Sequence, residues 1–374
     1  MKTKNKLDLC FEKAKEVIES CITPNGLYAS AGKDGYDAVW SRDSMISMIG
    51  ASLVQDKKKF KEVFKNSIRV LAENQSKVGQ IPNAVDKWAK DRKPHVDFKT
   101  IDSSLWFIIG NYVYKQRYKD ASLMKRYKKN IEKTYNWLAC QDSGETGTLT
   151  QLPTSDWQDA FPHRYGDTIN TQALYYKALN LAGRKSEADK MKKLVNENMD
   201  DGLWDKKNGY YYSYRWKNHG KYKEISDWFD TLGNLLAIVY GLATPSQSKK
   251  ILNYIKKTNI ANPYPLPTIH PPITKKSKHW KDYYLDCDAG NPGDYANGGV
   301  WGYVGGFYIL ALIKMKKFKL AEEMLNRLAK RNLEGNFPEW THRKTKKHYG
   351  KLQAWEAGMF ILAYKSFKSK KVLL

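Results

Sequence analysis

Helical periodicity runs through almost the whole of this chain. Apolar residues recur every three or four positions, the spacing that places them on one face of an α-helix. Short connections such as 243–246 and 315–318 join the helical segments in pairs, and long stretches rich in Gly, Pro, Asp and Trp separate the pairs. The pattern predicts helices at 3–21, 43–56, 58–74, 102–117, 120–139, 168–182, 184–198, 227–242, 245–258, 299–316, 318–332 and 352–368.

Six helical pairs with six long loops are typical of an all-α toroid of about twelve helices, an (α/α)6 barrel. In that fold we expect one helix of each pair to line the centre and the long loops to form a cleft at one end. Loops of this length inside a compact domain are usually functional. No linker or shift in composition divides the chain, so we expect a single domain over residues 1–374. Residues 209–216 favour a strand in a small hairpin.

The charge of the chain is strongly positive, because 64 Lys and Arg stand against 39 Asp and Glu, a net charge of +25. Such a field attracts phosphate backbones and acidic polymers. The lysines are nevertheless spread along most of the chain, and no nucleic-acid-binding motif accompanies them. We therefore do not expect nucleic acid as a partner. No heptad pattern indicates an oligomeric state.

The sequence also indicates a compartment. No segment reaches the roughly 20 apolar residues that span a bilayer, and the first 20 residues lack the apolar stretch of a secretory signal. Cys10, Cys21, Cys140 and Cys287 show no metal-binding or redox spacing, which favours free thiols in a reducing compartment. We expect a cytoplasmic protein with no membrane partner.

Two acidic residues stand among aromatic residues in the long loops. Asp159 lies in PTSDWQDAFPHR and Glu339 lies in GNFPEWTHR. Aromatic faces stack on sugar rings, and apolar surroundings can keep one carboxyl protonated near neutral pH. A glycosidase needs an acid to protonate the leaving oxygen and a base to activate water. The plainer alternatives are a turn cap for Asp159 and a solvated loop for Glu339.

Other loop-to-helix junctions repeat this combination of acids and aromatics. Trp40, Arg42 and Asp43 stand together in YDAVWSRDSMISMIG, and Asp102 opens a later helix. Either aspartate suits an N-cap, and Arg42 can pair with Asp43. Alternatively, the Arg and the carboxylate bind neighbouring sugar hydroxyls while Trp40 forms a wall.

The acid loop leaves two candidates open. Asp156 and Asp159 flank Trp157; Asp156 follows a serine and suits a turn cap, whereas Asp159 precedes a small alanine. We prefer Asp159 as the acid, although the sequence barely separates the two. We expect Trp301, before a later helix, to serve as a stacking platform for a sugar ring.

In order along the chain, these segments resemble glycoside hydrolases with (α/α)6 barrels: glucoamylases, the glucosidase domain of glycogen debranching enzymes, and neutral invertases. VWSRDSM is similar to their Trp-x-Arg-Asp motif, GQIPN to their Gly-x-Ile-Pro-Asn loop, and SDWQDA to the debranching-enzyme segment Thr-Trp-Met-Asp-Ala. Nearer the C-terminus, FDTLGNLLAIVYGLATPSQSKKIL, DYANGGVWGYVGGF, NFPEWTHR and GKLQAWEAG resemble neutral invertases. The resemblance covers roughly residues 24–368.

The resemblance implies a catalytic pair, with the general acid on Asp159 and its partner base on Glu339. The residues expected to bind substrate are Trp40, Arg42, Asp43, Asp102, Trp157, Asn297, Trp301 and Gln353. It implies no metal and no organic cofactor.

The chain departs from its relatives at two positions. Asn170 stands where they usually carry Glu, and Ala296 where they often carry His, so the departures put the identity of the substrate in question.

The function expected from these residues is inverting hydrolysis of α-glucosidic bonds in glycogen- or starch-type oligosaccharides. Trp157 and Phe161 are expected to desolvate Asp159 and keep it protonated, while Glu339 activates water. A neutral invertase-like hydrolase of sucrose is the alternative within the class. Outside it stand a sugar epimerase, for which His342 and His348 are the one close pair among seven His, and a non-catalytic carbohydrate- or polyanion-binding protein.

Overall fold

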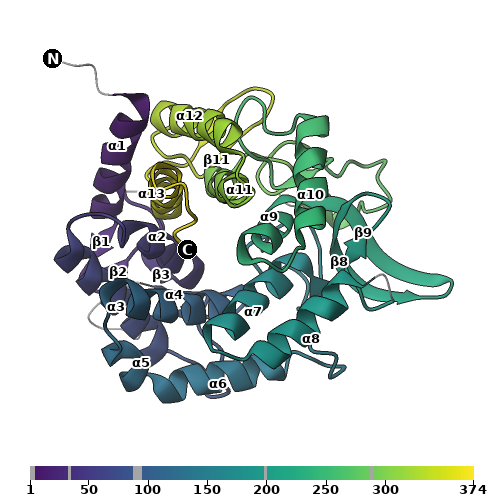
Figure 1. Cartoon of the computed structure of the whole chain (residues 1–374), viewed down its shortest axis with the longest axis horizontal. Helices are drawn as coiled ribbons and strands as arrows, with labels where there is room; N and C mark the ends of the chain where they lie inside the picture. Colours follow the sequence, from purple (N-terminus) through teal and green to yellow (C-terminus); the bar gives the residue numbers. More distant parts are fainter. Residues whose placement is uncertain (1–4, 33–34, 87–94, 198–199, 287–289) are drawn as a thin grey trace. The chain divides into compact units, whose positions relative to one another are not determined.

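The computed structural model describes residues 5–32, 35–86, 95–197, 200–286 and 290–374 (Figure 1). Cys287 therefore lies outside the described residues. Contacts between residues group the chain into two compact units. Unit 1 comprises Met1–Cys140, Leu325–Glu339 and Tyr349–Leu374, and unit 2 comprises Gln141–Met324 and Trp340–His348.

The described residues form thirteen α-helices and one short 3-10 helix. The helices of unit 1 are α1 (Lys6–Ser20), α2 (Ser41–Ala51), α3 (Lys57–Glu73), α4 (Asp102–Tyr118), α5 (Ser122–Arg126), α6 (Lys128–Ala139) and α13 (Ala354–Lys368). Those of unit 2 are α7 (Ile169–Leu181), α8 (Lys185–Asn196), α9 (Thr231–Tyr240), α10 (Pro245–Thr258), η1 (Asp282–Asp286) and α11 (Gly302–Lys314). Helix α12 (Phe318–Glu334) has residues in both units.

Short strands lie between the helices. Unit 1 contains β1 (Ile22–Thr23), β2 (Gly26–Leu27), β3 (Ala38–Trp40), β4 (Ala84–Asp86) and β5 (Val96–Asp97). Unit 2 contains β6 (Asp167–Thr168), β7 (Trp204–Asp205), β8 (Tyr210–His219), β9 (Tyr222–Asp230), β10 (Ile269–His270) and β11 (Trp340–Thr341). Strand β12 (His348–Tyr349) ends at the boundary of the units.

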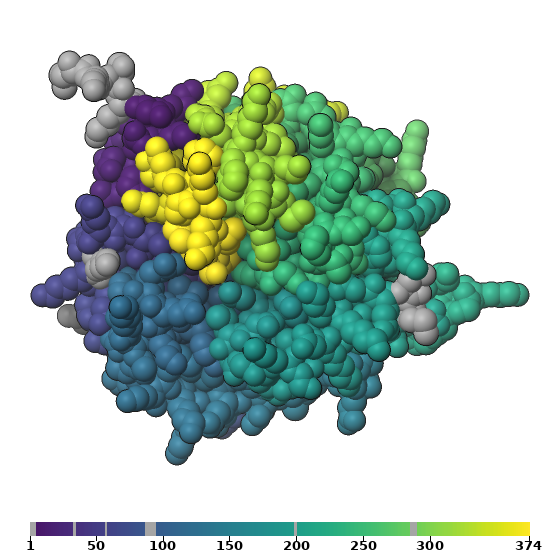
Figure 2. Space-filling view, viewed as in Figure 1, coloured from purple at the N-terminus to yellow at the C-terminus, as the bar shows by residue number. Residues whose placement is uncertain are grey.

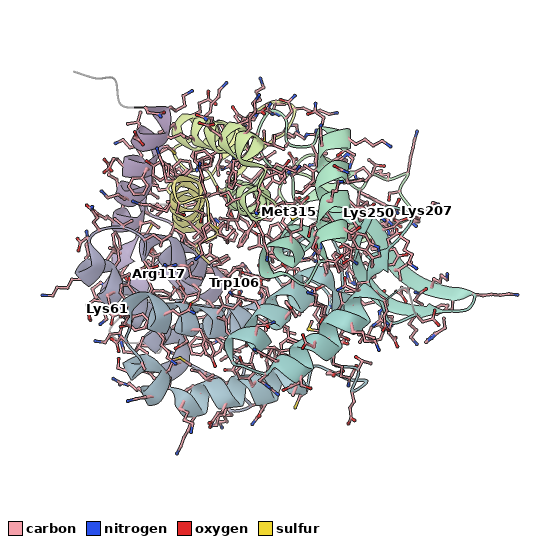
Figure 3. All side chains as sticks on the ribbon, viewed as in Figure 1. Lys61, Trp106, Arg117, Lys207, Lys250 and Met315 are labelled. Atoms are coloured by element: carbon pink, nitrogen blue, oxygen red, sulfur yellow. The ribbon has the colours of Figure 1, made fainter. Side chains whose placement is uncertain are left out.

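Buried and amphipathic helices alternate in each unit. In unit 1, helix α2 is buried on all sides and packs against α4 and α13 (Figure 1). Helix α1 exposes a face of mixed charge, and α3 exposes a lysine-rich one. A helix that is apolar all round belongs in a core, and an amphipathic one covers it. Figure 3 marks this contrast: Trp106 of α4 is 2% exposed, whereas Lys61 of α3 reaches Asp120 at 2.7 Å on the outside.

The packing of α2 on α13 depends on two glycines. A Cβ on Gly50 would lie 1.9 Å from the carbonyl oxygen of Gly358, and a Cβ on Gly358 would lie 2.4 Å from the Cα of Ser47. No side chain fits between these backbones. The glycines therefore let the C-terminal half of α2 approach the first turns of α13 closely.

The fold is mostly helical rather than all-α. In unit 2 the strands β10, β9, β8 and β6 form one antiparallel sheet, and β7 also pairs with β8. The β8–β9 hairpin contains the expected strand at 209–216 and projects from the rest of unit 2 (Figures 1 and 2). The expectation of a helix from residue 227 was wrong at its start, because 227–230 pair as the end of β9 and Asp230 caps a helix that begins at Thr231.

The expected helices otherwise lie within a few residues of the observed ones. The segment 120–139 is an exception, because it forms α5 and α6 with Tyr127 between them. Tyr127 leaves the helical conformation and donates its hydroxyl to Glu73 of α3 at 3.1 Å. Among the described residues, no helix is both long and apolar enough to cross a bilayer. Cys10 and Cys21 are buried free thiols and Cys140 is an exposed one.

Candidate active site

In unit 1, Arg42 links the beginnings of three buried helices. Its Nη1 lies 3.2 and 3.0 Å from the two carboxylate oxygens of Asp102, the first residue of α4. Its guanidinium lies 6.0 Å from the ring centre of Trp355 on α13. Both charged side chains are almost completely buried. Arg42 is therefore paired with Asp102, which lies 60 positions away in the sequence.

Neither Asp43 nor Asp102 is the N-cap residue of its helix. Helix α2 begins at Ser41 after Trp40, so that Asp43 lies within its first turn, 6% exposed. Asp102 likewise lies inside α4, whose cap residue Ile101 makes no side-chain hydrogen bond. Trp40 ends strand β3, its ring lies 5.8 Å from that of Tyr36, and its buried Nε1 has no hydrogen-bond partner among the described residues. Negative charge in the first turn of a helix is stabilised by the helix dipole.

Glu339 is half-buried at a pocket in unit 1. Tyr36 donates its hydroxyl to Oε1 of Glu339 at 3.1 Å. The pocket has a volume of about 340 Å³, and its wall includes Gln353 and Gly350. Gly350 has φ +65°, and a Cβ there would lie 2.9 Å from the Cβ of Glu339. Two expected site residues, Glu339 and Gln353, therefore line one pocket.

The loop that carries Glu339 is fixed by a buried ion pair. Arg331 of α12 and Glu356 of α13 are both fully buried, with Nη1 and Oε2 2.9 Å apart. The other guanidinium nitrogen of Arg331 donates to the carbonyl oxygens of Pro338 at 3.2 Å and Glu339 at 3.3 Å. Arg331 therefore holds the backbone of the Glu339 loop through two hydrogen bonds.

In unit 2 the acid loop is closed at its base. Gln151 and Gly166 exchange two backbone hydrogen bonds of 2.9 Å. Above this closure Arg164, fully buried, reaches Asp156 at 2.6 Å and Asp230 at 2.5 Å. Burial opposes its charge, but the two carboxylates together raise the pKa of Arg164. Arg164 thus ties the loop to the N-terminal end of α9, which Asp230 caps.

Asp156 and Asp159 differ sharply in their surroundings. Asp156 is fully buried and accepts hydrogen bonds from Arg164, from Nε2 of Gln151 at 3.2 Å and from the backbone of Gln158 at 2.9 Å. Its oxygens are occupied by structural partners. Asp159, three residues later, is exposed. This geometry favours Asp159 as the carboxyl that can reach a substrate.

The aromatic residues of the acid loop do not surround Asp159 as expected. Trp157 is 5% exposed and packs edge-on against Trp301 at 5.9 Å and Tyr303 at 5.4 Å between ring centres. Phe161 is fully buried against Tyr284, 4.4 Å away. Both rings are buried in unit 2 while Asp159 is exposed, so the expectation that they desolvate Asp159 was wrong.

Trp301 and Asn297 lie close together before α11, in different roles. Trp301 precedes the first residue of α11, and its Nε1 donates to the carbonyl of Tyr295 at 3.0 Å. Asn297 is fully buried, and its amide exchanges hydrogen bonds with the backbone of Ile273 and donates to that of Gly290. These bonds favour a structural role for Asn297, and substrate contact by it stays a prediction.

Several buried polar groups near the acid loop have no partner among the described residues. They are the side-chain amides of Gln158 and Asn170, Nε1 of Trp157 and the hydroxyl of Thr231. Asn170 and Thr231 stand at neighbouring helix ends, since a Cβ on Gly233 would lie 2.8 Å from the backbone nitrogen of Asn170. A buried polar group left unpaired costs about 1–3 kcal/mol. A polar ligand can satisfy such groups.

The histidine pair considered for an epimerase has structural bonds instead. Nδ1 of His342 accepts from the backbone of Lys344 and Thr345 at 3.2 and 3.0 Å, and His348 bonds to Thr341 at 2.9 Å. These bonds hold a turn in unit 2.

Sequence reasoning missed the positioning residues. Arg164, Arg331 and Glu356 are fully buried charges whose roles depend on partners distant in sequence. Arg164 and Glu356 lie inside the motif segments, and this position was the signal available for them. For Arg331 the signal was a charged residue on the apolar side of a helical pattern.

Comparison with known proteins bears on this site. The family described as Amylo-alpha-1,6-glucosidase matches residues 12–362. The probable alkaline/neutral invertase A, chloroplastic, of Arabidopsis thaliana is 24% identical over 328 residues, which cover 73% of this chain and 52% of that protein. The neutral/alkaline invertase 1, mitochondrial, of Oryza sativa subsp. japonica is 32% identical over 142 residues, 37% of this chain and 22% of that protein. The chain thus spans about half, or less, of the length of these relatives.

Solved structures share the fold. The GH63 mannosylglycerate hydrolase from Thermus thermophilus in complex with glucose has a TM-score of 0.69 at 14% identity, over 94% of this chain and 99% of that chain. A rhamnosidase from Klebsiella oxytoca with rhamnose bound has a TM-score of 0.68 at 15% identity, over 98% of this chain and 65% of that chain. At such identities the similarity concerns the fold alone.

Proposed function

This chain belongs to the amylo-alpha-1,6-glucosidase family, and from that premise we propose that it is an inverting glycoside hydrolase of α-glucosidic bonds in glycogen- or starch-type oligosaccharides. The observation that carries the proposal is the difference between the two aspartates of the acid loop. Asp156 is buried in an ion pair with Arg164, whereas Asp159 is exposed. Glu339, at a pocket wall in unit 1, is the partner base.

The proposed reaction is a single displacement. Asp159 protonates the glycosidic oxygen as the bond to the anomeric carbon breaks. Glu339 removes a proton from a water that attacks the same carbon from the opposite face. This mechanism requires about 6.5–9.5 Å between the two carboxyl groups, which leaves room for the water. The product then has the inverted anomeric configuration.

Each unit carries polar residues that suit the binding of a sugar. We assign Arg42, Asp43 and Asp102 to sugar hydroxyls, because all three charges are buried in unit 1 and the ion pair fixes Arg42 and Asp102 relative to one another. The unpartnered amides of Gln158 and Asn170 fit the same ligand class, since a polyhydroxylated substrate both donates and accepts. Trp40 offers partly exposed aromatic surface, whereas substrate contact by the buried Trp157 and Trp301 stays a prediction. We expect the bound sugar to exclude water from Asp159, the role that Trp157 and Phe161 do not fill.

A sugar-release assay tests the proposal. Maltose, isomaltose, maltotriose and sucrose are incubated separately with the protein, and the anomer released is followed by NMR before mutarotation. Release of glucose as the β-anomer from the α-linked substrates supports the proposal. Retention of configuration contradicts the roles of Asp159 and Glu339, and no release from any of the four contradicts hydrolysis of these bonds.

Hydrolysis of sucrose is the second candidate. The similarity to the Arabidopsis thaliana protein over 73% of this chain favours it. Sucrose presents an α-glucosyl group, so the same acid and base serve either substrate. A kcat/KM for sucrose above that for maltose and isomaltose would select this alternative.

A further inference from the structure

The C-terminal end of helix α9 gathers three lysines from three other helices of unit 2. Lys192 of α8 donates from Nζ to the carbonyl of Gly241 at 2.7 Å, and Lys314 of α11 donates to the carbonyl of Val239 at 2.7 Å. Nζ of Lys177 on α7 lies 5.5 Å from the ring centre of Tyr240, the residue between those carbonyls. Three ammonium groups therefore surround three consecutive residues. Helices α7 and α11 both pack against α9, as Figure 1 shows.

The positive charge at this point is not balanced. No ion pair joins Lys177, Lys192 or Lys314 to a carboxylate within the described chain. The carbonyl end of a helix carries about half a negative charge, which offsets only part of three positive ones. Burial lowers the pKa of Lys177, and burial together with Lys177 and Lys192 lowers the pKa of Lys314. The three groups are thus close enough to repel one another.

The ammonium groups at this place have donors that the described protein does not use, and one buried hydroxyl there has no partner. Each ammonium group has three N–H donors, and Lys192 and Lys314 each use one on a carbonyl. The hydroxyl of Tyr240 is buried and has no partner among the described residues. Gly241 adds space, because a Cβ there would come within 3.3 Å of Nζ of Lys314. A compact anion with several oxygens would satisfy the charges and the donors together.

We propose that Lys177, Lys192, Lys314 and Tyr240 form a binding site for a phosphate group, either free phosphate or the phosphate of a phosphorylated sugar. The site is separate from the aromatic cluster of Trp157 and Trp301. Helix α11 has 13 residues between Trp301 and Met315, the residue labelled in Figure 3 that follows Lys314. At 1.5 Å per residue this is about 20 Å. The bound anion would contact residues near the C-terminal ends of α7, α9 and α11 and would not touch the glycosidic bond.

Thermal unfolding of the full chain tests the site. Increasing inorganic phosphate is compared with chloride at equal ionic strength, and glucose 6-phosphate is compared with glucose. A ligand that binds only the folded state raises Tm with its concentration. We expect phosphate to raise Tm in the wild type. We expect Lys177→Met and Lys314→Met to need at least ten times more phosphate for the same rise.

Two variants control for general loss of charge or structure. Lys193→Met removes the exposed neighbour of Lys192 on α8 and is expected to respond like the wild type. Lys177→Arg keeps the charge and is expected to keep the response, which separates binding from a folding defect. A tighter response to glucose 6-phosphate than to phosphate identifies a sugar phosphate as ligand, and equal responses identify phosphate itself. An equal response of wild type, Lys177→Met and Lys314→Met, or no phosphate effect beyond that of chloride, overturns the proposal.

Discussion

At the scale of single residues, the two carboxylates of the acid loop have different surroundings. Asp156 has its oxygens occupied by Arg164, Gln151 and Gln158, whereas Asp159 stands exposed on the same loop. The oxygens of Asp156 are therefore engaged within the protein, whereas the carboxyl of Asp159 faces solvent. The difference in bonding, not in residue type, separates the structural from the proposed catalytic aspartate.

The first prediction concerns the proposed acid and base. Asp159→Asn and Glu339→Gln should each lower kcat by about 10²–10⁴-fold, the usual contribution of a general acid or base. The free energy of unfolding should change little for Asp159→Asn, because the side chain is exposed. Steady-state kinetics and urea unfolding measure both. Asp227→Asn, a half-exposed carboxylate of unit 2 paired with Lys278, is the control and should keep its kcat.

The second prediction concerns Asn170, whose buried amide lacks a partner among the described residues. Asn170→Leu removes an unsatisfied polar group at similar volume, so the free energy of unfolding should stay constant or rise. If the amide binds substrate, kcat/KM should fall tenfold or more. Asn234→Leu is the matched control, because the amide of Asn234 bonds to the backbone of Tyr211 and Asp230. That variant should lose stability. A kcat/KM unchanged in Asn170→Leu would remove Asn170 from the binding residues.

At the scale of elements, each proposed catalytic loop is held by a buried arginine. Arg164 joins the acid loop to the cap of α9, and Arg331 joins the Glu339 loop to α13 through Glu356. Loops carry function when a rigid scaffold positions them. Because both guanidinium groups are fully buried, their charges are stable only with their carboxylate partners present.

The third prediction distinguishes two roles of Arg331: stabilising the fold through Glu356 and positioning the loop that carries Glu339. Arg331→Met leaves Glu356 buried without its partner and should destabilise the protein by about 3–5 kcal/mol. The double variant Arg331→Met/Glu356→Leu removes both charges and should regain much of that stability. Its kcat should remain low, because the carbonyls of Pro338 and Glu339 have lost their donor. Full recovery of kcat in the double variant would show that Arg331 has no positioning role.

At the scale of the whole molecule, the buried charges and histidines make stability depend on pH. Burial lowers the pKa of His163, His270 and His279, with help from Lys281 at His163 and Arg343 at His270. At His279 the neighbouring Asp227 opposes this effect without reversing it. All three histidines therefore favour the neutral form in the folded chain.

The fourth prediction follows from these shifts. The unfolded chain binds protons at histidine near pH 6.5, above the pKa values of the folded state. Stability from these groups is complete above about pH 6.5 and is lost as the pH falls below it, because the unfolded state then binds more protons. Tm should decrease from pH 7.5 to pH 5.5. His270→Asn should make this decrease smaller, and an unchanged pH dependence of its Tm would contradict the assignment.

The sequence alone predicted most of the helical segments and supplied the candidates for catalysis and binding. Apolar periodicity is local, so the helices were predicted within a few residues, as at α4 and α10. The motif around Glu339 and Gln353 led to two residues that line one pocket. Hairpin residues 227–230 were assigned to a helix because strand pairing depends on a partner strand, here β8, that local periodicity does not report.

Only the tertiary structure decided which charges pair. Arg42 meets Asp102, 60 positions away, and Arg164 meets Asp230, 66 positions away. Such pairs form because buried charges must be neutralised by whatever carboxylate the packing of helices brings near. The same packing turned Trp157 and Phe161 into the core and left Asp159 exposed, since aromatic rings gain more from burial than a carboxylate can. The sequence sets the residue types, and the fold decides which charged residues are buried in ion pairs and which stay exposed.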